Sequence, residues 1–102
     1  MPSSVTIDRR QLSRACEQHG ICRLSLFGSA LRSDFGPASD VDVLAEFEPG
    51  RTPGLLRLHV IEQELSSAFA GRVVDLATPG CLNRLIRDAV LAEAEVEYES
   101  PQ

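Results

Sequence analysis

The chain has 102 residues, ordinary apolar and charged fractions, and a formal net charge of -5. This length predicts a single domain, residues 1–102, with a buried core but without room for a separate substrate-binding lobe. The negative charge argues against general nucleic-acid binding, which depends on clustered Lys and Arg side chains.

The first two elements are predicted by capping residues and apolar spacing. Apolar residues recur at helical spacing over residues 8–19, with Asp8 placed as an N-cap and Gly20 as a C-terminal stop. Residues 21–27 form a short apolar and β-branched run that ends at Gly28, which is typical of a buried strand.

The middle of the chain predicts a turn, a loop and a second strand. Residues 28–32 have the pattern of one or two helical turns that begin at the glycine. Residues 33–39 are rich in Gly, Pro and Ser, so we expect an exposed loop. Residues 40–47 form the second strand.

The rest of the chain predicts two helices around a third strand. The clearest amphipathic stripe comprises Leu55, Leu58, Ile61, Leu65 and Phe69, and Gly71 ends this helix. Residues 72–77 form the third strand. Pro79 then suits a first helical turn. The last helix carries Leu82, Leu85, Ile86, Ala89 and Val90. The tail, residues 96–99, is compatible with either an edge strand or an extension of the helix.

This order of elements predicts an α/β (α+β) fold, with a small mixed β-sheet of three to four strands flanked by helices. The sequence has neither a signal-like start nor a run long enough to span a bilayer, so we expect a cytoplasmic protein without membrane contact. The cysteines Cys16, Cys22 and Cys81 are too scattered for a metal knuckle and are expected to be reduced thiols.

One glycine turn and three acidic residues predict a site that binds phosphate and metal ions. In Leu26-Phe27-Gly28-Ser29 a strand runs into a glycine turn, whose N–H groups and hydroxyl are suited to phosphate oxygens. Asp40 and Asp42 lie two residues apart, and strand geometry therefore places both carboxylates on one face. Either element alone is more often purely structural, because Gly-Ser turns and solvated Asp residues at strand ends are common.

The third acid, Asp75, lies between Val74 and Leu76 in an apolar strand. Asp is disfavoured in strands and rarely buried without a partner, so a charged partner is expected. If the third strand lies beside the second, Asp40, Asp42 and Asp75 form one group, here called the acidic triad. Carboxylate oxygens suit Mg²⁺, and two such ions would clamp a displacement at phosphorus.

Gly28-Ser29, ten intervening residues and then Asp40-Val41-Asp42 resemble the signature of DNA polymerase β-like nucleotidyltransferases, and Asp75 stands where that superfamily has its third acid. The resemblance is strongest to the minimal nucleotidyltransferase (MNT) family, many of whose members are antitoxins paired with HEPN-domain toxins. It covers nearly the whole chain and implies the polymerase β-like fold.

The resemblance also implies roles for individual residues. Gly28, Ser29, Arg32 and Ser39 would bind the nucleotide, with Gly28 and Ser29 holding the triphosphate. The acidic triad would bind two Mg²⁺ ions, and Asp75 would help to deprotonate the acceptor hydroxyl. The family commonly has glycine after the arginine, whereas this chain has Ser33, a change that alters the loop without removing a catalytic group.

The function implied by the resemblance is transfer of AMP from ATP to a hydroxyl, expected to be a tyrosine, of a partner HEPN toxin, so that the chain acts as an antitoxin. One alternative is a non-catalytic antitoxin that neutralises its partner by complex formation. Another is an antibiotic-type nucleotidyltransferase, although such enzymes generally have an added helical domain. Either a homo-oligomer or a hetero-oligomer is compatible with the sequence.

Overall fold

The computed structural model describes residues 6–28 and 40–100. In chain order its elements are α1 (Arg9–His19), β1 (Ile21–Phe27), β2 (Val41–Phe47), α2 (Leu55–Ala68), β3 (Val74–Ala77), the 3-10 turn η2 (Pro79–Cys81), α3 (Arg84–Glu93) and β4 (Glu95–Glu99). None of the helices in these ranges has the length and apolar character that crossing a membrane requires.

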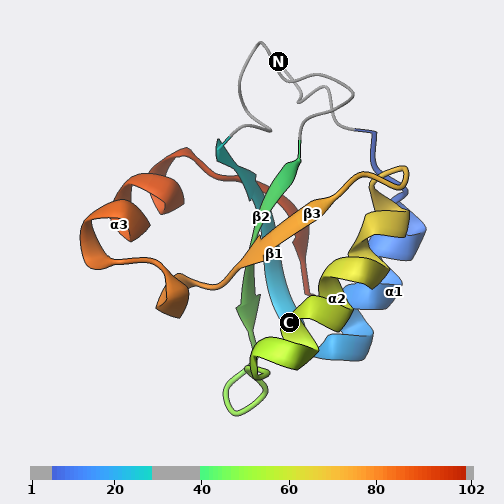
Figure 1. Cartoon of the computed structure of the whole chain (residues 1–102), viewed down its shortest axis with the longest axis horizontal. Coiled ribbons are helices and arrows are strands. Elements are labelled where there is room, and N and C mark those ends of the chain that lie inside the picture. Colours follow the sequence, from blue (N-terminus) through green and yellow to red (C-terminus); the bar gives the residue numbers. More distant parts are fainter. Residues whose placement is uncertain (1–5, 29–39, 101–102) are drawn as a thin grey trace.

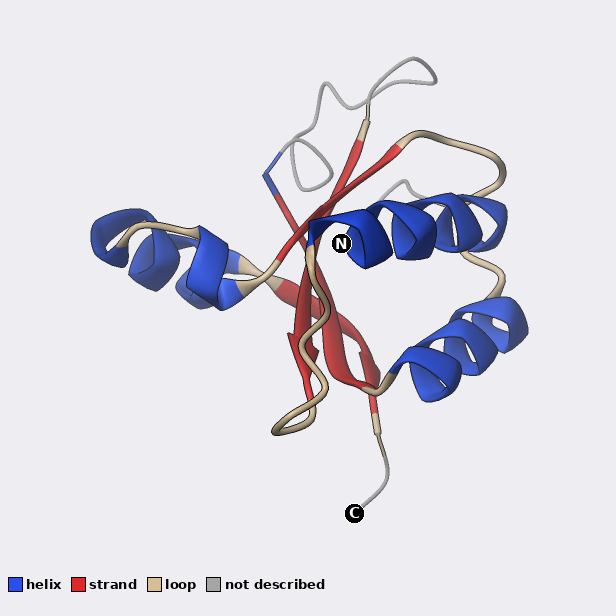
Figure 2. Ribbon diagram, turned by 60° about the horizontal axis from the view of Figure 1, so that its bottom comes forward, coloured by secondary structure: helices blue, strands red, loops and turns tan. Residues whose placement is uncertain are grey.

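The four strands form one mixed sheet in the order β3-β2-β1-β4. β1 pairs antiparallel with both β2 and β4, whereas β2 and β3 pair in parallel. Helices α1 and α2 lie together on one side of the sheet and α3 lies on the other (Figures 1 and 2). This arrangement confirms the predicted α/β class and the mixed sheet of up to four strands.

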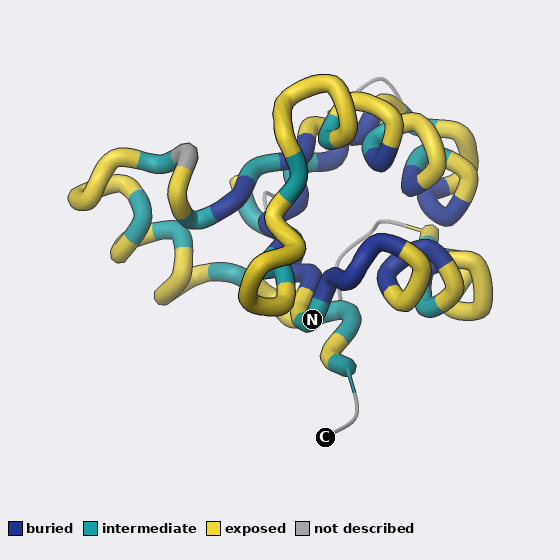
Figure 3. The backbone as a smooth tube through the Cα atoms, turned by 90° about the horizontal axis from the view of Figure 1, so that it is seen from below, coloured by how far each residue is buried: buried dark blue, intermediate teal, exposed yellow. Residues whose placement is uncertain are grey.

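The core fills the space between the sheet and the pair α1 and α2. Its fully buried large side chains are Phe69, Leu12, Ile21, Leu24, Leu26, Ile61, Leu65, Val41, Val43 and Cys16. Figure 3 shows the buried segments gathered where α1 and α2 face the strands. Removal of this apolar surface from water is the main force that holds the two layers together.

The capping prediction for α1 is confirmed. The Asp8 side chain accepts a hydrogen bond from the Gln11 backbone N–H at 3.2 Å. At the other end Gly20 has φ 74°, a left-handed conformation that favours glycine. The two caps fix both ends of the helix, and β1 follows directly with the predicted bounds.

The apolar stripes of the other two helices are only partly buried, which corrects the prediction. In α2 the residues Ile61 and Leu65 are buried, but Leu55 at the start is 81% exposed. Helix α3 begins at Arg84, and none of its residues is buried. Its Leu85 is 84% exposed. The helical period predicted the apolar face of α3 correctly, but that face, unlike the one of α2, contributes no buried residue.

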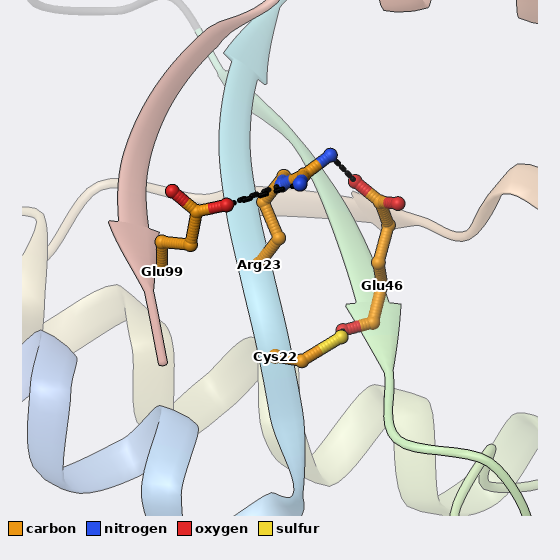
Figure 4. Close-up of polar contacts among 4 residues, drawn as sticks. All are labelled: Cys22, Arg23, Glu46 and Glu99. Atoms are coloured by element: carbon orange, nitrogen blue, oxygen red, sulfur yellow. Dashed lines mark hydrogen bonds and ion pairs between the residues drawn. The ribbon is translucent and has the colours of Figure 1, made fainter. Parts of the chain in front are cut away.

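Strand β4 settles the question left open for the tail, because it pairs with β1 instead of extending the helix. Arg23 of β1 links the strands on both sides (Figure 4). Its Nη2 lies 3.0 Å from Oε2 of Glu99 on β4, and its Nη1 lies 3.5 Å from Oε2 of Glu46 on β2. The Cys22 Sγ also donates to the Glu46 carbonyl at 3.2 Å. Side chains thus supplement the backbone pairing of β1 with both of its neighbours, β2 and β4.

Candidate active site

Gly28 directly follows β1, at the end of the sheet where β2 begins, in a left-handed backbone conformation that favours glycine. Its φ is 61°, and a left-handed conformation costs an L-residue with a side chain roughly 1–2 kcal/mol. The Asp42 carboxylate lies directly against the position that a Gly28 side chain would take. The glycine therefore leaves room for that carboxylate at the end of β1.

Strand β2 carries Asp42 on the face of the sheet opposite the core. Val41 and Val43 on either side are buried in the core, whereas Asp42 is half-buried. Asp42 pairs with Phe27, the residue before Gly28, in the antiparallel ladder. Asp40 directly precedes the strand and is exposed. A period of two places Asp40 and Asp42 on the same side, as the sequence predicts.

Asp75 lies beside Asp42, because β3 pairs with β2 in parallel and these two residues are register partners. Directly paired residues of parallel strands project to the same face, so the two carboxylates are neighbours. Asp75 itself is exposed, although Val74 and Leu76 on either side of it are buried. The expectation that the third strand lies beside the second is confirmed.

The charge around Asp75 is strongly negative. Partial loss of water around its carboxylate raises the pKa of Asp75 above its usual value, and the carboxylates of Asp42, Glu62 and Asp40 raise it further. Like charges held this close favour protonation of one of them or the binding of a cation.

The donor set fits a hard divalent cation such as Mg²⁺, which binds carboxylate oxygens and keeps water and phosphate ligands. Within residues 6–28 and 40–100, no three His, Cys, Asp or Glu side chains form a ready-made metal group. The acids thus do not by themselves form a closed cage, and such an ion would need further ligands from phosphate and water. Ser29, Arg32 and Ser39 lie outside the described residues.

Glu62 is a further acid near this edge that the sequence reasoning missed. It projects from α2, and its Oε2 accepts a hydrogen bond from the Leu76 backbone N–H at 2.8 Å. A signal for it was present in the sequence. Glu62 falls between Leu58 and Leu65 at helical spacing, where a charged residue interrupts the apolar stripe.

Residues 9–97 match the family model described as nucleotidyltransferase domain. The fold is that of the polymerase β-like nucleotidyltransferases, as the match to a solved structure also shows. The chain belongs to the nucleotidyltransferase domain family, and it is accordingly a nucleotidyltransferase.

Two relatives cover most of the chain. One, from Methanocaldococcus jannaschii, is named provisionally as a protein adenylyltransferase and is 35% identical over 86 residues, which are 84% of this chain and 89% of the relative. The other is the protein adenylyltransferase MntA of Thermococcus cleftensis, 34% identical over 91 residues, or 89% of this chain and 86% of the relative.

Solved structures share the fold. A provisionally named minimal nucleotidyltransferase superposes with a TM-score of 0.67 at 35% identity, covering 84% of this chain and 85% of its own. A toxin–antitoxin structure with AMP-PNP gives a TM-score of 0.73 at 17% identity, covering 94% of this chain and 77% of its own. The MntA–HepT toxin–antitoxin structure gives 0.63 at 16% identity, covering 90% and 70%. At such low identity the last two support the fold alone.

Proposed function

We propose that this chain transfers AMP from ATP to a tyrosine hydroxyl of a HEPN-type toxin and thereby acts as its antitoxin. The observation that carries the catalytic part is the register pairing of Asp42 with Asp75 beside Gly28. That pairing brings the carboxylate oxygens of Asp42 and Asp75 together on one face of the sheet. Phosphoryl transfer assisted by metal ions requires oxygen ligands of this kind.

In this proposal Asp40, Asp42 and Asp75 would hold two Mg²⁺ ions, which would supply positive charge next to the triphosphate. The acceptor oxygen attacks the α-phosphorus of ATP and forms a new P–O bond. The bond from that phosphorus to the oxygen bridging to the β-phosphate breaks, and pyrophosphate leaves. The Asp75 carboxylate takes the hydroxyl proton as general base.

The choice of a protein acceptor is supported by the relatives, both of which carry the name protein adenylyltransferase. The choice of a toxin is supported by the relative named MntA, because an MntA protein also appears in the MntA–HepT toxin–antitoxin structure. The tyrosine and the HEPN class come from the resemblance to the MNT family. Gly28, together with Ser29, Arg32 and Ser39, is proposed to hold the nucleotide.

The test mixes the purified chain with the product of the neighbouring gene, Mg²⁺ and ATP labelled at its α-phosphate. We expect label on the partner, and mass spectrometry should locate AMP on a tyrosine. The variant with both Asp40→Ala and Asp42→Ala should transfer no label, and EDTA should also abolish transfer. Asp88→Asn serves as a matched control, because Asp88 is an exposed acid on α3. Label that persists in the double variant would exclude the proposed site.

A second candidate function is a non-catalytic antitoxin that neutralises its partner by binding. The exposed apolar residues Leu85 and Ile86 on α3 favour it, because such residues commonly mark protein contacts. In a growth assay with the toxin, neutralisation that survives Asp40→Ala plus Asp42→Ala would support this function over the catalytic one.

A further inference from the structure

Glu62 occupies an unusual place for an acid, on the side of α2 that faces the edge strand β3. Its side chain is only 22% exposed. One carboxylate oxygen, Oε2, accepts the Leu76 N–H at 2.8 Å, and the other, Oε1, lies 3.5 Å from Nδ1 of the exposed His59. The acid therefore connects the helix to the residue that follows Asp75.

This hydrogen bond lies on the outer edge of the sheet. The Val41 N–H donates to the Val73 carbonyl at 2.8 Å, so residue 73 directs its carbonyl toward β2. Because backbone groups alternate along a strand, the N–H of Leu76 points away from β2. β2 is the only strand beside β3 in the described sheet. Glu62 thus satisfies an outward donor that the sheet itself leaves without a strand partner.

The hydrogen bond between Glu62 and Leu76 also restrains the position of Asp75, the residue before Leu76. β3 has only four residues, Val74–Ala77, and few interactions hold so short an edge strand in place. β2 fixes its inner edge through the register that pairs Asp42 with Asp75, and Glu62 fixes its outer edge one residue further on. Loss of the outer contact would let β3 shift relative to β2 and move the Asp75 carboxylate.

A hydrogen-bond acceptor alone would not need a charge, since a glutamine amide accepts an N–H equally well. The carboxylate places another negative charge within electrostatic range of Asp75. Such a charge strengthens the attraction of a divalent cation to the carboxylates of Asp42 and Asp75. We infer that Glu62 is a positioning residue of the nucleotidyltransferase, which holds Asp75 opposite Asp42 through Leu76 and strengthens metal binding through its charge.

This inference rests on the proposed function, so its first test does not require an acceptor. Hydrogen exchange of the Leu76 amide, followed by NMR, reports the contact directly. We expect exchange at least about tenfold faster in Glu62→Ala than in the wild type, and near the wild-type rate in Glu62→Gln. Equal rates in all three proteins would overturn the positioning role, whatever the activity of the chain.

The second test separates the bond from the charge by metal binding. Titration with Mn²⁺ in the presence of AMP-PNP, followed by electron paramagnetic resonance, should show weaker binding by about threefold or more in Glu62→Gln. His59→Ala, which removes the exposed neighbour and keeps the carboxylate, should bind as the wild type does. Unchanged affinity in Glu62→Gln would overturn the charge role.

The third test uses AMP transfer at saturating Mg²⁺. Glu62→Ala should lower kcat by about tenfold to a hundredfold with little change in KM for ATP, because a small displacement of a catalytic group affects the transition state most. Glu62→Gln should restore kcat to within about threefold, because it keeps the acceptor. Wild-type kcat in Glu62→Ala would overturn the inference, whereas absence of transfer in every protein, the wild type included, would instead refute the proposed function.

Discussion

Gly28 and Asp42 approach so closely that a β-carbon on Gly28 would lie 2.7 Å from Oδ2 of Asp42, a separation that real β-carbons essentially never show. An alanine at Gly28 would therefore force the carboxylate to move, and it would also have to adopt a φ of 61°. We expect Gly28→Ala to lower the free energy of unfolding by about 1–2 kcal/mol. AMP transfer should fall more than about tenfold.

Gly50→Ala is the matched control. Gly50 has φ 79°, but a β-carbon there would meet no atom within 4 Å. The two variants should thus lose comparable stability in urea unfolding, while only Gly28→Ala loses activity. Equal loss of activity in both would mean that backbone strain, and not contact with Asp42, explains the effect.

Removal of the Asp75 charge should make the metal-free protein more stable at neutral pH. Partial loss of water and the nearby carboxylates, Asp42 first, raise the folded-state pKa of Asp75 above the ordinary value of 3.8. The folded state therefore keeps this proton more tightly than the unfolded state, and the resulting stability is lost as the pH rises through the folded pKa.

Thermal unfolding of Asp75→Asn at pH 7, without divalent cations, should accordingly give a higher Tm than the wild type. The gain should be modest, because Asp75 is exposed and salt screens it, and it should vanish below pH 3.8, where both states are protonated. The same variant should lack transfer activity. A lower Tm at pH 7 would contradict the repulsion described above.

The stability that the buried Cys16 thiol contributes should decrease as the pH rises into the alkaline range. Burial, with a smaller effect of Glu17, raises the pKa of the Cys16 thiol from 9.0 to about 12. Between these values the unfolded chain loses the proton and the folded chain keeps it, so stability falls as the pH rises above 9. One such group contributes a slope of about 1.4 kcal/mol per pH unit.

Urea unfolding of the wild type and Cys16→Ala at several pH values from 8 to about 11 measures this difference. The variant should be less stable than the wild type at pH 8, because it leaves space in the core. The gap should narrow as the pH rises. Parallel pH profiles for the two proteins would show that the thiol does not titrate differently in the two states.

Two leucines should respond oppositely to truncation. Leu65 of α2 is fully buried, so Leu65→Ala should cost about 2–5 kcal/mol of unfolding free energy. Leu85 of α3 is 84% exposed, and Leu85→Ala should change that free energy by less than about 0.5 kcal/mol. Chemical denaturation of the isolated chain measures both. A large cost for Leu85→Ala would mean that α3 packs against this chain after all.

Local signals explain which parts of the fold the sequence predicts. The bounds of α1 and β1 follow from Asp8 and Gly20, because caps act within a few residues of the chain. The apolar faces of α2 and α3 are also predicted from the sequence, because helical spacing is likewise a local pattern. An apolar period, however, reports only which face favours burial, and it does not say what covers that face. Leu55 and Leu85 belong to these predicted faces and are nevertheless exposed.

Prediction of the candidate site was similarly uneven. The spacing of Asp40 and Asp42 predicts a shared face by strand period alone. In the structure Asp42 lies in β2, whereas Asp40 directly precedes the strand. The position of Asp75 depends on which strands pair, which no single strand encodes, so the sequence supported it only as a condition. Glu62 acts through a backbone N–H of a different element, and a side chain to main chain contact of this kind leaves little signal beyond a charge in an apolar stripe.

The parallel pairing of β2 with β3 has a consequence for folding. The two strands are joined through α2, so Asp42 and Asp75 become neighbours only when the chain between β2 and β3 has closed. Before that step the acids belong to separate parts of a flexible chain and repel each other only weakly. The ability to bind metal and nucleotide would then arise together with the tertiary structure, so that catalytic competence would report completed folding.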